Sequence, residues 1–466
     1  MKKILFLLSV LVVSAACHED EVKNVDTVEP QQTPQPLKTP EITIGNNGNW
    51  WIDGKDTGVP AQGGEAPSIE IGHNGHWWVG GKDTGVSARG EGAAELLSIT
   101  WEEGKLVFVF SDGRTIRVAV EAPPTPGSPD IVVAEPAGGF EVNTRQWFRL
   151  EPQVQSQTPV EFLWKLGGKD ISTDKEVVHV FEKAGVYILT LLAKNDAGQS
   201  VRNIPVKVEE KTHGSWTNRV YEFVRAPGQH ANAYPTIPAG SSYAEVLDKV
   251  NASIVSKSVV SLGAYGGYVV MGFDHVLVNS PGNDFLVHGN AFANFAEPGV
   301  IEVSWDANGN GLPDDAWYEI AGSEYNAPTA RHGYSLTYYN PATDTERAAG
   351  ATGTRWTDNQ GNAGYFPATA WPNWAGDSIV VGGSKYENLN ADGSLSTAAF
   401  AYGYADNWPN GDVRAQIDLD LAVDAAGKPV HLKGIDFVKV YTGVFAHAGA
   451  LGEISTEVSG VEDLNL

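Results

Sequence analysis

The chain has 466 residues, too many for a single average core, and it is rich in turn-forming and aromatic residues, with 52 Gly, 26 Pro, 14 Trp, 16 Tyr and 16 Phe. This composition is typical of an all-β multidomain protein and excludes a mainly helical one. The 57 acidic residues outnumber the 32 basic residues, and a net charge of −25 argues against a nucleic-acid partner, because phosphates would be repelled.

Residues 1–17 have the pattern of a signal peptide. Two lysines precede an apolar run from Ile4 to Val13, which is too short to span a membrane, and small residues then lead to Cys17, the only cysteine. This end resembles the lipobox of bacterial lipoproteins, and the acidic residues after Cys17 resemble the surface-export signal of Bacteroidetes lipoproteins. The resemblance implies lipidation of Cys17 and a lipid anchor on the extracellular face of the outer membrane. The alternative is a secretory peptide with an incidental cysteine.

Residues 18–40 are polar and contain four prolines, so we expect a disordered tether. Residues 41–122 are predicted to form a spacer of small β-hairpins, because Ile42–Val59 is matched by Ile69–Val86 at an offset of 69 − 42 = 27 residues. Each unit reads as a strand, an Asn-Gly turn, a Trp-Trp strand and a Gly turn. The paired tryptophans favour core packing, with sugar binding as the alternative.

Residues 130–210 follow a proline-rich linker and alternate like the strands of a β-sandwich. The run His179–Leu191, followed by Asn195–Gly198, resembles PKD domains, an Ig-like sandwich family. Trp164 falls where that family keeps a buried tryptophan, whereas Lys165–Asp170 replaces its acidic loop. The resemblance implies a spacer or a protein-contact module.

Residues 212–466 form the largest segment, and we expect a β-jelly roll with one short helix at Ala244–Ile254, where apolar residues recur at helical spacing. The expected strands are Ser258–Leu262, Tyr268–Phe273, His275–Val278, Asp284–Val287, Gly299–Ser304, Trp317–Ile320, Ser378–Val381, Ala415–Leu419 and Ile435–Tyr441.

A cluster of oxygen-bearing side chains follows one of these strands. Its members alternate along a glycine-rich loop and are Asp306, Asn308, Asn310, Asp314 and Asp315. The spacing matches the first half of an EF-hand loop and predicts a structural Ca²⁺ site, although Trp317 stands where an EF-hand has its bidentate glutamate. Further ligands would be backbone carbonyls, water or a distant acid such as Glu297 or Glu319. The alternative is an Asx-rich turn without metal.

Aromatic residues are concentrated in polar loops of the same segment. The predicted ligand-binding set is Tyr365, Phe366, Trp371, Trp374, Tyr402, Tyr404 and Trp408. Residues 364–376 are expected to be irregular rather than strands, and aromatics in such a loop either close a core or face a sugar or a corrin. The turn Asp406–Asp412 is a candidate second cation site.

Several motifs together resemble the C-terminal domain of Bacteroidetes PKD-containing cell-surface lipoproteins. They include Gly289–Phe292, Ala296–Gly299, the Asp306 loop, Trp317–Gly322 and Gly434–Tyr441. Members of that family can be encoded with outer-membrane uptake systems, including those for corrinoids. The resemblance implies capture of a glycan or corrinoid, or contact with a TonB-dependent receptor.

No common catalytic motif occurs in the sequence, and the histidines are dispersed. We therefore expect a non-catalytic protein. The alternatives are a glycan hydrolase, which needs two suitably separated carboxylates, and a purely structural adhesin or stalk.

Overall fold

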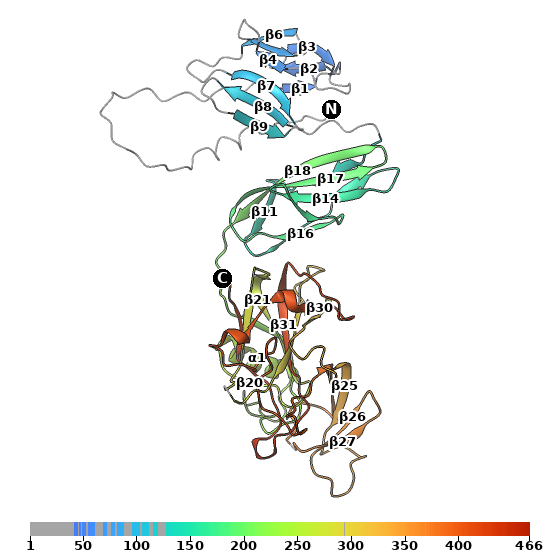
Figure 1. Cartoon of the computed structure of the whole chain (residues 1–466), viewed down its shortest axis with the longest axis vertical. Helices are drawn as coiled ribbons and strands as arrows, with labels where there is room; N and C mark the ends of the chain where they lie inside the picture. Colours follow the sequence, from blue (N-terminus) through green and yellow to red (C-terminus); the bar gives the residue numbers. More distant parts are fainter. Residues whose placement is uncertain are drawn as a thin grey trace, which may run out of the picture. The chain divides into compact units, whose positions relative to one another are not determined.

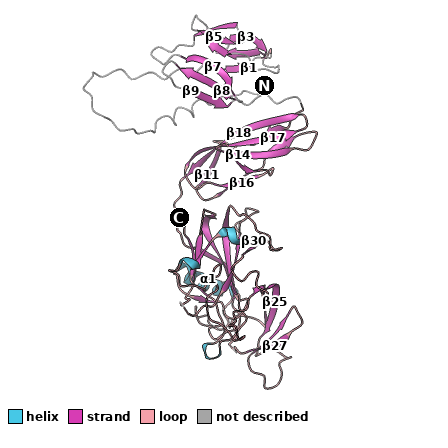
Figure 2. Ribbon diagram, viewed as in Figure 1, coloured by secondary structure: helices cyan, strands magenta, loops and turns pink. Residues whose placement is uncertain are grey.

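The structure is a computed structural model in which almost every regular element is a strand (Figure 1). It describes residues 127–466 apart from 293 and 369, and, between residues 42 and 119, the strands and one turn. The expected signal peptide, lipidation site and tether at residues 1–40 lie outside the described residues. Within the described part of the chain one α-helix occurs, α1 (Tyr243–Val255), and the all-β prediction is confirmed (Figure 2). None of the described helices has the length and hydropathy of a membrane span.

The chain divides into two compact units. The first contains residues 1–131, 154–162 and 190–203, and the second contains residues 132–153, 163–189 and 204–466. Every site discussed below lies within the second unit.

The predicted repeat forms two matching sets of antiparallel strands. In the first set β1 (Ile42–Ile44), β2 (Asn49–Ile52) and β3 (Lys55–Pro60) form one sheet. In the second set β4 (Ile69–Ile71), β5 (His76–Val79) and β6 (Lys82–Ser87) repeat the pairing and continue into β7 (Leu96–Glu102), β8 (Lys105–Phe110) and β9 (Thr115–Ala119). Each unit thus has a third strand where only a glycine turn was expected.

The segment after the proline-rich linker contains nine strands in three sheets. The main sheet has the order β11-β18-β17-β14-β15, and the pairs β10-β13 and β12-β16 complete the set. The nine strands are β10 (Asp130–Val132), β11 (Phe140–Asn143), β12 (Trp147–Leu150), β13 (Gln153–Gln155), β14 (Glu161–Leu166), β15 (Lys169–Ser172), β16 (Val177–Val180), β17 (Gly185–Asn195) and β18 (Gly198–Glu209). Trp164 is completely buried, as its position predicted, and its indole nitrogen donates to the carbonyl of Asp174 at 3.1 Å.

The C-terminal segment is built on a six-stranded antiparallel sheet with the order β19-β21-β31-β23-β24-β30. Its strands are β19 (Arg219–Val224), β21 (Tyr268–Val278), β23 (Gly299–Ser304), β24 (Tyr318–Ile320), β30 (Ala422–Val423) and β31 (Gly434–Thr442). Smaller sheets are β20 (Val260–Ser261) with β32 (Glu457–Val458), and β29 (Gln416–Ile417), β22 (Phe285–His288) and β33 (Gly460–Asp463) in that order.

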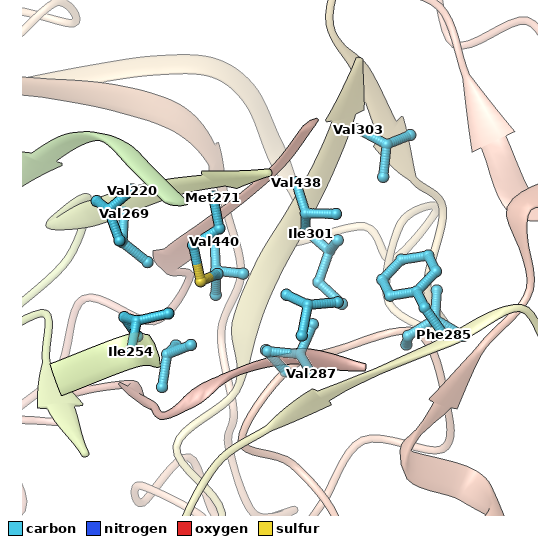
Figure 3. Close-up of a cluster of buried hydrophobic side chains, with 14 of the residues drawn as sticks. Val220, Ile254, Val269, Met271, Phe285, Val287, Ile301, Val303, Val438 and Val440 are labelled. Carbon is cyan, nitrogen blue, oxygen red and sulfur yellow. The ribbon is translucent and has the colours of Figure 1, made fainter. Parts of the chain in front are cut away.

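One hydrophobic core lies between the six-stranded sheet, helix α1 and the sheet that contains β22. Figure 3 shows Met271 and Val438 of the large sheet facing the same interior as Phe285 and Val287 of β22. Helix α1 adds Val246, Val250 and Ile254, which are completely buried and recur at the helical spacing that predicted it. The expected double-layered β architecture is therefore present.

A separate four-stranded sheet with the order β27-β26-β25-β28 was not fully predicted. Its strands are β25 (Arg331–Tyr339), β26 (Thr354–Asp358), β27 (Ala363–Phe366) and β28 (Ser378–Lys385). Only the start of β28 was expected, and the prediction that residues 364–376 contain no strand is wrong at its first three positions. Because β27 pairs with β26, the side chain of Tyr365 points outward while Phe366 packs inward.

Candidate functional site

The Asp306 loop brings its predicted ligands together. The side-chain amides of Asn308 and Asn310 lie 2.9 Å from carboxylate oxygens of Asp314. These hydrogen bonds lower the pKa of Asp314. Asp306 accepts backbone N–H groups of Gly309 and Gly311 at 2.8 and 2.9 Å. The donor set is the oxygen-rich one that Ca²⁺ takes, while the side-chain oxygens of Asp306, Asn308 and Asn310 accept backbone N–H groups, as in an Asx-rich turn. Ca²⁺ binding at this loop therefore stays a prediction.

Other acids considered for this loop have different roles. Asp315 accepts the backbone N–H of Ala307 at 2.9 Å and closes the base of the loop. Glu319 instead accepts the hydroxyls of Ser384 and Tyr386, and its burial raises its pKa. Glu319 therefore serves a buried hydroxyl network, and of the further ligands suggested from the sequence it is not available to this loop.

The predicted aromatic ligand-binding residues do not form one platform. Phe366 and Tyr404 are 4% and 2% exposed and belong to two different hydrophobic cores, so for them the packing alternative is correct. Trp371 and Trp374 pack against cores on part of their surfaces. Tyr365 and Tyr402 are exposed, at 38% and 47%. The physical reason for the dispersal is strand alternation and core closure, which loop composition does not reveal.

The predicted cation site at the turn 406–412 is not assembled. Asp412 pairs with Arg414, which lowers the Asp412 pKa to about 2, and the same guanidinium covers the ring of Trp408 at 3.4 Å. Asp406 is 3% exposed and points instead into a different cluster. Asp406 and Asp412 therefore belong to separate clusters. The Arg414 guanidinium covers one face of the Trp408 ring, so that face is closed to a ligand.

That cluster borders a cavity of about 420 Å³, which we call the acidic cavity. It is lined by aromatic, amide and carboxylate side chains, namely Gln229, His230, Tyr234, Val259, Asn290, Phe292, Phe295, Glu297, Glu453, Ser455 and Glu457. Phe292 and Tyr234 are 70% and 54% exposed, so apolar surface stands at the rim while the carboxylates lie deeper. A concave site with aromatic walls and a few convergent polar groups is the usual form of a ligand pocket.

Three carboxylates meet behind the cavity wall. Ligand oxygens of Glu297, Asp406 and Glu457 all lie within 4.8 Å of one another, a grouping that could hold a divalent ion. Asp406 accepts the backbone N–H groups of Asn290 and Glu457 at 2.8 and 2.9 Å. Glu297 accepts the backbone N–H of Ser455 at 2.9 Å. The cluster thus ties together three segments that are distant in the sequence.

Burial favours the protonated form of these three carboxyl groups. Desolvation raises the pKa of Glu297 to about 7, that of Asp406 to about 8 and that of Glu457 to about 9. The neighbouring carboxylates add to the shift, because two like charges in one site cannot both ionise cheaply. At neutral pH the cavity wall therefore carries both hydrogen-bond donors and acceptors.

The opposite wall is positioned by Arg225, which is 1% exposed. Its guanidinium donates to the carbonyls of Ala231, Ala233 and Tyr234 at 3.0, 2.9 and 2.6 Å. Burial lowers its pKa to about 9. Because the rigid fork of arginine fixes several carbonyls at once, it holds the segment 230–234 against the cavity.

Close backbone approach completes this wall. Gln229 donates its backbone N–H to both carboxylate oxygens of Glu453, at 2.8 and 3.0 Å. A Cβ at Gly228 would lie 2.1 Å from Glu453 Oε1, so any larger residue would displace that carboxylate. The backbone N–H of Gln229 thereby fixes the orientation of the Glu453 carboxylate.

Most residues of the acidic cavity were not predicted as a site. Glu297 was considered only as a metal ligand or catalytic acid, and Gly289–Phe292 only as part of a family resemblance. The available signal was the placement of Phe292 and Phe295 in an irregular, polar stretch next to a strand. That signal identifies a candidate segment but not its partners, which come from residues 229–259 and 453–457.

Comparison with known proteins identifies one segment. Residues 128–195 match the PKD-like domain family, in agreement with the sandwich and with the resemblance seen in the sequence. No curated protein sequence matches this chain.

Solved structures give distant similarities. An α-galactosidase homologue from Bacteroides fragilis is 21% identical, and the match covers 18% of each chain with a TM-score of 0.15. The fibronectin(III)-like modules of Clostridium thermocellum CbhA are 18% identical over 28% of this chain and 70% of theirs, with a TM-score of 0.17. A structure from a study of carbohydrate-binding modules of the β-sandwich superfamily is 10% identical over 74% of this chain and 100% of its own, with a TM-score of 0.17.

Proposed function

We propose that this chain is a non-catalytic lipoprotein of the outer membrane, exposed on the extracellular face, and that its C-terminal β domain captures a nutrient in the acidic cavity. The observation that carries the proposal is the cavity itself, with about 420 Å³ of space between aromatic rims and buried carboxylates. The location rests on the signal-peptide pattern and on Cys17. The resemblance to PKD-containing surface lipoproteins supports a TonB-dependent receptor as partner.

The ligand is a glycan or a corrinoid. Carboxyl groups at the cavity wall suit a ligand that carries many hydrogen-bonding groups, as sugar hydroxyls and the peripheral amides of corrinoids do. A volume of about 420 Å³ is near the lower end for ligand pockets, which favours one or two sugar rings, or one edge of a corrinoid, over an enclosed macrocycle. Phe292 supplies an exposed ring on which an apolar sugar or corrin face can pack.

Ca²⁺ at the Asp306 loop is proposed to have a structural role. Asp306, Asn308, Asn310 and Asp314 would hold the ion, with Asp315 bracing the loop, and the ion would supply charge neutralisation rather than chemistry. Binding rather than hydrolysis is supported by the sequence, in which no common catalytic motif occurs.

The test is binding of the mature chain to cobalamin and to a glycan panel by calorimetry, with and without EDTA. Phe292→Ala removes a side chain that is 70% exposed, so it leaves the fold intact and is expected to weaken binding at least about tenfold. The matched control is Val413→Ala, which changes a residue that is 65% exposed and does not line the cavity. Unchanged binding in Phe292→Ala, or no binding by the unmodified chain, would refute the proposal.

A further inference from the structure

A second concave site lies on the outer face of the six-stranded sheet, and we call it the Trp317 groove. Its volume is about 350 Å³, and its floor and walls include Glu222, Tyr268, Trp317, Ser335, Val380 and Lys439. None of these residues lines the acidic cavity. The groove therefore requires its own explanation.

The floor of the groove follows directly from strand register. Glu222 of β19 is paired with Val270 of β21, Val270 with Lys439 of β31, and Lys439 with Glu302 of β23. These residues therefore form one lateral row, on the face opposite to the core residues Val269 and Val438. The row places the polar side chains of Glu222, Lys439 and Glu302 around the buried Val270, and the hydrogen-bonded strands that carry it are a rigid base for a ligand.

The walls come from two other elements. Trp317 immediately precedes β24 and follows the Asp306 loop, whose Pro313 also lines the groove. On the other side stands β28, an edge strand of the four-stranded sheet, with Val380 68% exposed. An aromatic ring thus faces an apolar edge across a polar floor.

The charges in the groove select against ionic ligands. The Lys439 ammonium lies 2.9 Å from the Glu302 carboxylate and 5.1 and 6.0 Å from the ring centres of Tyr268 and Trp317. Its charge is therefore compensated before any ligand arrives, and the exposed Glu222, which accepts the Tyr268 hydroxyl at 3.2 Å, repels anions. Aromatic rings beside hydrogen-bonding groups of both signs favour a neutral, polyhydroxylated ligand.

We propose that the Trp317 groove binds a neutral saccharide ring, with its apolar face on Trp317 and its hydroxyls on Glu222 and Lys439. This site is independent of the acidic cavity, and it gives the C-terminal domain two places to hold a glycan. The predicted Ca²⁺ loop bears on it, because Pro313 and Trp317 flank the last ligands of that loop.

The experiment is ligand-observed NMR on the mature chain with glucose, galactose, mannose and xylose and their β-linked disaccharides. We expect saturation transfer to at least one sugar from the Phe292→Ala chain, in which binding at the acidic cavity is weakened, and affinity reduced about tenfold or more when Trp317→Ala is added to that chain. Leu389→Ala, at a residue that is 50% exposed, is the control for loss of an exposed apolar side chain.

Three results would overturn the proposal. The first is that no sugar receives saturation from the unmodified chain. The second is that Trp317→Ala keeps full affinity while its circular dichroism is unchanged. The third is that Phe292→Ala abolishes the saturation-transfer signal, which would assign the binding to the acidic cavity. Should Trp317→Ala fail to fold, Glu222→Ala at an exposed position gives the same test. Loss of a hydrogen bond to that carboxylate is expected to weaken binding about tenfold.

Discussion

Glu457→Gln is predicted to stabilise the C-terminal domain at neutral pH. Glu457 is 6% exposed and lies beside Glu297 and Asp406, and desolvation raises its pKa from 4.5 to about 9. Glutamine has the shape of the protonated acid and can still accept the hydroxyl of Ser455, which lies 3.0 Å from Glu457 Oε1. The substitution therefore preserves the native contacts and removes only the ionisation.

The direction follows from proton linkage. Between pH 4.5 and about 9 the folded chain keeps a proton on Glu457 that the unfolded chain has lost, so the stability of the natural protein falls as pH rises through this window. Below pH 4.5 both states are protonated and the effect vanishes. At pH 7.5 the cost is about 1.4 × (7.5 − 4.5), or about 4 kcal/mol, if Glu457 alone holds the proton. Because three carboxyl groups share the titration, we expect roughly half of that.

The assay is urea unfolding of the mature chain in EDTA at pH 4.0 and pH 7.5, followed by tryptophan fluorescence. EDTA ensures that no divalent ion neutralises the cluster. The control is Asp248→Asn, which changes an exposed acid on α1. Equal stability of Glu457→Gln and the natural protein at pH 7.5, or a gain of the same size at pH 4.0, would show that the carboxyl groups are not electrostatically coupled as described.

Two further predictions concern the metal loop and the cavity wall. Ca²⁺ at a hundred times its dissociation constant should stabilise the chain by about 2.7 kcal/mol. Asp314→Asn should largely remove this stabilisation, whereas the control Asp392→Asn, in an Asx turn elsewhere, should keep it. Thermal unfolding with and without EDTA measures the stabilisation, and the absence of a calcium effect on the natural protein would contradict the prediction. Gly228→Ala should destabilise the domain by roughly 1 to 3 kcal/mol, because its Cβ would lie 2.1 Å from Glu453 Oε1. Urea unfolding measures the loss of stability, with Gly411→Ala as the control, because a Cβ there meets nothing within 4 Å. Equal losses of stability in the two variants would contradict the prediction.

Elements with a clear period were predictable from the sequence. The apolar spacing at positions 246, 250 and 254 predicted α1, and the apolar runs in Gly299–Ser304 and Ile435–Tyr441 predicted two central strands within one residue of their ends. Helix α1 buries one face, which sets its spacing, whereas the two strands are buried along almost their whole length, which makes them continuous apolar runs. The buried position of Trp164 was instead implied by the resemblance to PKD domains.

The four-stranded sheet could be predicted only in part. Tyr334, Leu336 and Tyr338 do alternate, and all three are buried, so a signal for β25 was present. Its partners β26 and β27 are short and carry glycine and polar residues, which makes them indistinguishable from loops until a neighbouring strand pairs with them. Tertiary pairing, and not local propensity, places Phe366 in a core.

The acidic cavity illustrates a different obstacle. Its carboxylates come from residues 297, 406, 453 and 457, and each is surrounded in the sequence by unremarkable turn or strand residues. In a chain with 57 acidic residues, no spacing rule selects these four. They are recognisable only once folding has buried them together, because it is burial that raises the pKa values of Glu297, Asp406 and Glu457.

The Asp306 loop shows how one local motif serves several structures at once. Asp436 of β31 accepts the backbone N–H of Asp306 at 2.7 Å and the indole N–H of Trp147 from β12 at 2.8 Å. Arg149, two residues further along β12, donates to the carbonyl of Ala307 at 2.8 Å. The start of the loop is thus fixed by the sheet and by the PKD-like segment, while its far end carries Pro313 and Trp317 into the groove. An ion that orders the loop would therefore act on the groove through covalently adjacent residues, which links the proposed cation site to the proposed saccharide site.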